Sequence, residues 1–131
     1  MRILLDTHIL IWAITTPERL EPPARAAILD AENEILFSAA SIWEIAIKVA
    51  LRRADFVARP EIVTQEALDI GFVELPVRAT TAARVADLPL LHRDPFDRLL
   101  IAQAIEQPAA LYTADDILTG YTDLVQRVAR R

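Results

Sequence analysis

The segment Arg2-Ile3-Leu4-Leu5-Asp6 decides the fold class, because a short branched apolar run ends there in a single carboxylate. Such a run predicts a strand that is buried on both faces of a sheet. Further strands are predicted at residues 35–37, 72–75, 111–113 and 124–128. Helical patterns lie between them, at residues 7–14, 21–30, 38–53, 60–70, 80–86 and 94–106. This alternation predicts an α/β fold with a mostly parallel sheet and helices on both of its faces.

The composition predicts one globular domain over residues 1–131, since hydrophobic residues make up 53% of the chain. The absence of Cys excludes disulfides, thiolate catalysis and zinc–thiolate sites. No apolar stretch reaches the roughly 18 residues of a membrane span, and Asp6 interrupts the first apolar run, so a cytoplasmic protein without a membrane segment is expected. The net charge of −5 argues against a protein that coats nucleic acid. It does not exclude a nuclease, whose metal-binding acids would contribute to that charge.

Four carboxylates are candidates for one site, namely Asp6, Glu44, Asp97 and Asp115. Asp6 and Asp115 each follow a predicted strand, and parallel sheets bind their ligands beyond the carboxyl ends of the strands. Glu44 lies on a narrow polar stripe of a helix whose apolar residues, Trp43 among them, are expected to be covered. Asp97 lies in the first turn of a helix, on its apolar face, where an unpaired carboxylate is costly. Because Mg²⁺ prefers oxygen ligands, the four acids indicate metal-dependent phosphate chemistry.

Each of these acids also has a purely structural explanation. Asp6 is a favoured helix-capping residue, and Asp115 could cap a short helix that follows it. Glu44 and Lys48 are spaced for a helical ion pair of about 0.3–0.5 kcal/mol. Asp97 would interact favourably with the dipole of its own helix.

Polar residues near the acids complete the predicted site. Thr7 is expected beside it, and Thr113 is expected to hold a metal-bound water. Asp116 is interpreted as a solvated acid or as one that supports the ligands from outside. Asp94 is assigned the structural task of capping a helix. Arg98 is predicted to contact a phosphate, or else to lie on the surface or in an ion pair.

Four stretches of the chain, each containing one of the acids, match the pattern of a known family in that family's order. They are Leu4-Leu5-Asp6-Thr7-His8-Ile9-Leu10-Ile11-Trp12, Ser38-Ala39-Ala40-Ser41-Ile42-Trp43-Glu44-Ile45-Ala46-Ile47-Lys48, His92-Arg93-Asp94-Pro95-Phe96-Asp97-Arg98-Leu99-Leu100-Ile101-Ala102-Gln103-Ala104 and Leu111-Tyr112-Thr113-Ala114-Asp115. On these stretches the chain resembles the PIN-domain family, and within it the VapC-type toxins of type II toxin–antitoxin pairs.

The resemblance implies a three-layer α/β/α sandwich with a five-stranded parallel sheet. It also implies an endoribonuclease that depends on Mg²⁺ or Mn²⁺, with Asp6, Glu44, Asp97 and Asp115 as metal ligands. In such an enzyme a metal-activated water cleaves the RNA phosphodiester bond. A homodimer and a cognate antitoxin that inhibits the enzyme are implied as partners. The RNA target, the number of metal ions and the acid that accepts the proton of the water are not predicted.

Three other classes of protein share part of this pattern. A receiver-type signalling domain also holds Mg²⁺ at acids on strand ends, but it requires a Lys after a late strand, and Lys48 lies in a predicted helix. A haloacid-dehalogenase-like phosphatase requires Asp-x-Asp after the first strand, where this chain has Asp6-Thr7-His8. A PIN fold that only binds RNA or a partner is the third alternative, and the retention of all four acids argues against it.

Overall fold

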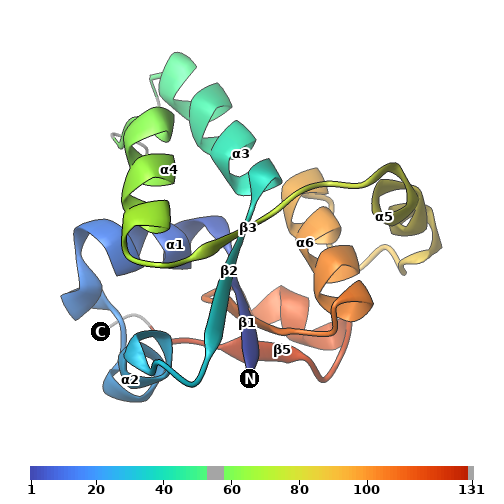
Figure 1. Cartoon of the computed structure of the whole chain (residues 1–131). Coiled ribbons are helices and arrows are strands. Elements are labelled where there is room, and N and C mark those ends of the chain that lie inside the picture. Colours follow the sequence, from blue (N-terminus) through green and yellow to red (C-terminus); the bar gives the residue numbers. More distant parts are fainter. Residues whose placement is uncertain (53–57, 130–131) are drawn as a thin grey trace.

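The computed structural model describes residues 1–52 and 58–129, and its five strands form a sheet in which each neighbouring pair is parallel (Figure 1). The strands are β1 (Arg2–Leu5), β2 (Glu34–Ser38), β3 (Val73–Leu75), β4 (Ala110–Thr113) and β5 (Val125–Arg127). Each strand falls at a range predicted from the sequence, so the predicted strands are confirmed, the last one included.

In the described part of the chain, six helices connect and cover the strands. They are α1 (Thr7–Thr15), α2 (Pro22–Leu29), α3 (Ala39–Ala50), α4 (Pro60–Asp69), α5 (Ala79–Arg84) and α6 (Pro95–Glu106), with short 3₁₀ turns at Pro17–Arg19, Val85–Asp87 and Asp116–Gly120. The predicted helix over residues 38–53 ends earlier, at Ala50, and Arg53 lies outside the described residues. Within the described part of the chain, no helix is long and apolar enough to cross a membrane.

Helix starts follow from local sequence. Asp6, Ser38 and Asp94 have extended backbones, and each accepts hydrogen bonds from amides of the helix that it precedes. These bonds satisfy amides that have no partner inside the helix. Pro95 occupies the first position of α6, where its missing N–H costs nothing.

Two apolar cores lie on opposite faces of the sheet, which makes the fold the predicted three-layer sandwich. Side chains of successive strand residues point to opposite faces, so Ile3 and Leu5 belong to one core and Leu4 to the other. The first core is filled mainly by residues of α1 to α4, and the second by residues of α6. In Figure 1, α1, α2, α3 and α4 lie on one side of the strands, and α5 and α6 lie on the other.

The strand order β3-β2-β1-β4-β5 places a switch point between β1 and β4. From β1 the chain first builds outward through β2 and β3, and it then returns to the opposite edge of β1 to form β4 and β5. Crossover connections leave the two sides of such a point in opposite directions, which opens a crevice beyond the strand ends. Asp6 directly follows β1, and Asp115 lies two residues beyond Thr113, the last residue of β4. Both acids therefore lie at this crevice.

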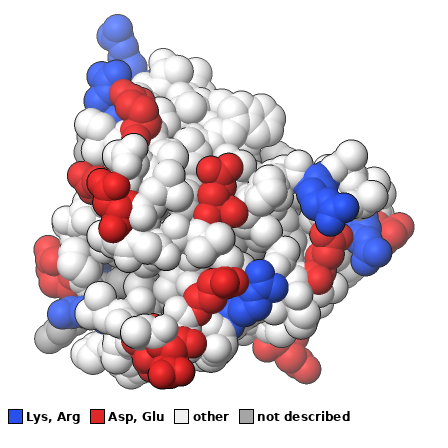
Figure 2. All heavy atoms as spheres, viewed as in Figure 1, with Lys and Arg blue, Asp and Glu red and all other residues white. Residues whose placement is uncertain are grey.

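The charged side chains on the face in Figure 2 are scattered, and both signs occur over the same elements. This face shows no continuous basic stripe of the kind that grips a nucleic-acid backbone.

Candidate active site

A cleft of about 850 Å³ lies at the switch point, and Asp6, Glu44, Asp97 and Asp115 all line it. The four acids come from separate places in the fold, since Asp6 follows β1, Glu44 lies in α3, Asp97 lies in the first turn of α6 and Asp115 lies just beyond β4. The structure therefore brings together four side chains that are spread over more than a hundred positions of the sequence.

The Asp6 carboxylate both caps a helix and lines the cleft. Its Oδ1 accepts a hydrogen bond of 2.9 Å from the Ile9 amide in the first turn of α1. Burial raises the pKa of Asp6, and the nearby charge of Glu44 acts in the same direction. A hydrogen bond from the Thr113 side chain and the one from the Ile9 amide oppose the increase. The capping explanation is thus correct for Asp6, and it does not compete with a place in the cleft.

Glu44 is buried and held from two sides. The Thr7 hydroxyl donates to its Oε1 at 2.6 Å, and Lys48 Nζ lies 2.6 Å from its Oε2. The helical ion pair with Lys48 therefore exists, but Glu44 is only 4% exposed and the neighbouring Ser41 only 1%. The ion pair with Lys48 therefore does not place Glu44 on a solvent-exposed face of α3.

Trp43, next to Glu44, does not agree with the expectation that the apolar residues of this helix are covered. It is 62% exposed, so the prediction that the apolar residues of α3 are covered is wrong for this side chain in the isolated chain. Its ring meets Phe96 of α6 edge to face, with centroids 5.3 Å apart. This pair joins the two helices beside the cleft.

Asp97 lies in surroundings that disfavour its charged form. Burial, followed by the charges of Asp94 and Asp6, raises its pKa from 3.8 to about 7, although a hydrogen bond with His92 lowers it. The prediction that Asp97 shares the apolar face of its helix is confirmed, because its neighbours on that face have no exposed surface. They are Leu100, Ile101 and Ala104.

Asp115 ends the turn after β4 and caps the following 3₁₀ helix, with its Oδ1 accepting from the Ile117 amide at 2.9 Å. Its own amide donates to the fully buried Thr113 hydroxyl at 3.1 Å. The Thr113 hydroxyl therefore contacts both strand-end acids, the Asp6 side chain and the backbone amide of Asp115. Asp116 is not among the residues that line the cleft; its side chain is 75% exposed and pairs with Arg127.

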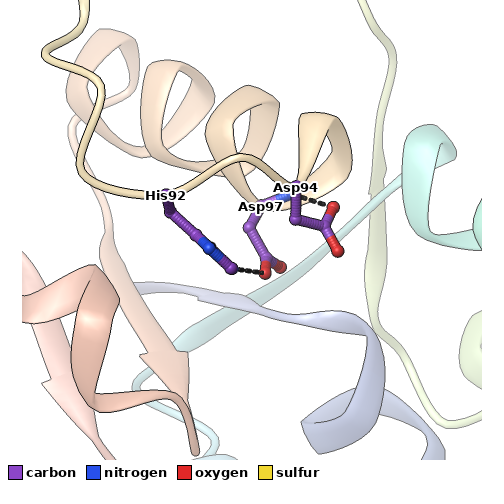
Figure 3. A group of neighbouring side chains, drawn as sticks. All are labelled: His92, Asp94 and Asp97. Carbon is purple, nitrogen blue, oxygen red and sulfur yellow. Dashed lines mark hydrogen bonds and ion pairs between the residues drawn. The ribbon is translucent and has the colours of Figure 1, made fainter.

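His92 is the residue of the site that the sequence interpretation did not assign. Its Nε2 lies 3.0 Å from Asp97 Oδ2 and 3.3 Å from Asp115 Oδ2. Figure 3 shows His92 and Asp97 pointing toward one another, with Asp94 at the start of the same helix. Asp94 caps α6 as predicted, yet it also lines the cleft. The signal available in the sequence was a histidine two residues before Asp94, the cap of a helix that has another acid in its first turn.

Comparisons with known proteins agree with this geometry. Residues 3–123 match the family described as PIN domain. The chain belongs to the PIN domain family. It is also 32% identical over 120 residues to Ribonuclease VapC22 of Mycobacterium tuberculosis, which covers 91% of each chain. The resemblance to VapC-type PIN domains is therefore confirmed.

Solved structures share the fold of this PIN domain. The crystal structure of VapBC2 from Rickettsia felis, bound to a DNA fragment from their promoter, matches with a TM-score of 0.68 at 20% identity, covering 98% of this chain and 99% of that one. The structure of FitAB bound to IR36 DNA matches at 0.60 and 26% identity, covering 95% and 94% of the two chains. FitAcB from Neisseria gonorrhoeae matches at 0.56 and 24%, covering 95% of each.

Arg98 of this PIN domain lies inside the fold and not at the position predicted for it from the sequence. The residue is only 8% exposed, and its guanidinium donates to the backbone carbonyls of Val85, Leu88 and Pro89 at 3.0, 3.3 and 2.8 Å. Both predicted alternatives, a phosphate contact and a surface or ion-pair position, are wrong. The charge is used inside the fold, on the segment that precedes His92.

The side chains of the cleft fit a divalent cation. Buried carboxylates that repel one another have raised pKa values, as Asp6 and Asp97 do, and a cation among them would remove that repulsion. One ligand atom each from His92, Asp94 and Asp97 lie within 4.8 Å of one another. Carboxylate oxygens are the ligands that suit Mg²⁺ and Mn²⁺.

Proposed function

We propose that this PIN domain, residues 1–131, is a metal-dependent endoribonuclease and the toxin of a toxin–antitoxin pair that acts in the cytoplasm. The observation that carries the proposal is the meeting of four carboxylates, from four separate elements, in one cleft at the switch point of the sheet. The name of the M. tuberculosis relative, Ribonuclease VapC22, supports RNA as the substrate.

Asp6, Glu44, Asp97 and Asp115 are the proposed ligands of Mg²⁺ or Mn²⁺. A divalent ion held there would lower the pKa of a bound water and stabilise charge on the scissile phosphate. The chain itself supplies orientation. Thr7 fixes one oxygen of Glu44, while Lys48 lies against the other.

The rest of the cleft has the chemistry and the size for nucleotides on either side of the scissile bond. The residues that line it beyond the acids include Trp12, Thr15, Thr16 and Arg19. Arg19 is exposed and offers a planar guanidinium, which suits phosphate oxygens. We assign this part of the cleft to the RNA backbone.

The proposed partners are a second copy of the chain and an antitoxin. An antitoxin that inserts an Arg or Lys among the four acids would compete with the metal for the same oxygens. The exposed Trp43, beside the cleft, offers an apolar contact for the second copy. The complex with the antitoxin is therefore expected to be inactive and low in bound metal, and the free chain to be active.

The test is RNA cleavage by purified Asp6→Asn protein beside wild type, each with Mg²⁺ and with excess EDTA. Asn retains the helix cap that Asp6 provides, so the fold should persist by circular dichroism while cleavage is lost. Asp123→Asn, at an exposed position, is the matched control and should cleave like wild type. Full cleavage by Asp6→Asn protein, or by wild type in EDTA, would falsify the metal-dependent mechanism.

A further inference from the structure

We infer that His92 is a positioning residue for the metal-binding carboxylates, and that Arg98 and Tyr121 hold it in place. The inference deepens the proposed function and rests on it. His92 Nε2 reaches two carboxylates that belong to different elements, Asp97 of α6 at 3.0 Å and Asp115 beyond β4 at 3.3 Å. One ring nitrogen thus connects the two acids on this side of the switch point.

The contact with His92 determines how Asp97 can present itself to a cation. Oδ2 is the oxygen bound to the imidazole, so Oδ1 is left for a metal. Hydrogen bonds from outside a metal site orient its ligands, and their removal typically weakens metal binding about 10–100-fold. The His92 and Asp97 side chains are only 21% and 19% exposed, so their contact is largely shielded from water and can orient the carboxylate.

The backbone of His92 is held by a partly buried network of hydrogen bonds. Its amide donates to the Tyr121 hydroxyl at 2.9 Å, and that hydroxyl also accepts from Arg98 Nη1 at 3.1 Å. Arg98 binds the three carbonyls of residues 85–89 described above, so a single guanidinium secures the segment that leads into His92. Because Arg98 directly follows Asp97 in α6, the same helical turn holds the carboxylate and the group that anchors its partner.

Burial of this guanidinium is costly unless its N–H groups find acceptors. Here the acceptors are three backbone carbonyls of the segment that leads into His92 and the hydroxyl of Tyr121, which itself contacts the His92 backbone. The network therefore fixes the path of the segment that leads into His92. In this way it also determines where the His92 ring lies in the cleft.

The experiment measures Mn²⁺ binding to the full chain by calorimetry, with Mn²⁺ electron paramagnetic resonance as a second readout. His92→Ala should bind Mn²⁺ about 10–100-fold more weakly than wild type. His92→Gln should recover most of the affinity, because its amide nitrogen can occupy the place of Nε2. Tyr121→Phe, which removes the hydroxyl between Arg98 and His92, should lie between the two.

Tyr112→Phe is the matched control, since it removes a hydroxyl for which no hydrogen bond is formed among the described residues, and its affinity should be that of wild type. Thermal unfolding checks that each variant is folded. A folded His92→Ala protein within twofold of the wild-type affinity would overturn the inference, as would His92→Gln binding no better than Ala. Wild type that binds no Mn²⁺ would overturn it together with the metal mechanism. Wild type that binds Mn²⁺ normally but cleaves no RNA would contradict only the proposed function.

Discussion

Replacing Asp97 by Asn should stabilise the metal-free protein, by an amount that depends on pH. The folded protein holds the proton of Asp97 up to about pH 7, whereas the unfolded chain releases it near 3.8. Between these values the folded state binds more protons, so its stability falls as the pH rises. The pKa of Asp97 thus differs by about three units between the folded and unfolded states. At about 1.4 kcal/mol per unit, wild type has lost roughly 4 kcal/mol of its free energy of unfolding at pH 8, and the variant has not.

The weakened hydrogen bond with His92 offsets roughly 1 kcal/mol of this gain, so about 3 kcal/mol should remain at pH 8. Urea denaturation in EDTA, at intervals from pH 4.5 to 8.5, measures the difference between the two proteins. Near pH 4.5 the Asn variant should be as stable as wild type or slightly less stable. Asp123→Asn should show no such trend. A difference that is constant over the whole range, or a wild type that is the more stable protein at pH 8, would refute the reasoning.

Three further substitutions test other parts of the structure. Thr7→Val removes the hydroxyl that donates to buried Glu44 Oε1 and should cost about 1–3 kcal/mol in urea denaturation, together with reduced RNA cleavage. Unchanged values of both would show that this contact is unimportant. Trp43→Ser should dissociate the proposed homodimer in light scattering while the monomer stays folded; a dimer that persists would place the interface elsewhere. Ile101→Ala, at a position with no exposed surface, should lose about 2–5 kcal/mol, and a loss below 1 kcal/mol would contradict the assigned core.

The three central strands, β1, β2 and β4, could be predicted from the sequence because each contains a short apolar run with a polar or turn residue after it. Leu4 and Ile3 belong to opposite cores, and a strand of this kind carries apolar residues at successive positions. Helix starts were equally readable, since Asp94-Pro95 combines a cap with a first-turn proline. Local sequence contains both kinds of information.

The candidate site was predictable where it depends on strand ends and helix faces, as for Asp6, Asp97 and Asp115. His92 was not, because it lies in an irregular connection with no periodicity to indicate where its ring points. Arg98 was misjudged for the related reason that its acceptors are backbone carbonyls, which exist at every position and leave no mark in the sequence. The exposure of Trp43 depends on what covers α3, and an amphipathic pattern does not state that.

The strand order has a consequence for synthesis of the chain. β1 is made first but pairs on one side with β4, about a hundred residues later, so the crevice between them cannot exist until β4 has been made. A nascent chain that stops before Ala110 would carry Asp6, Glu44 and Asp97 without the strand that closes the sheet around them. For a protein proposed to cut RNA, this delays assembly of the cleft until β4 has been synthesised. A fragment ending at residue 109 should accordingly bind no Mn²⁺, and retained binding would show that the cleft forms without its last wall.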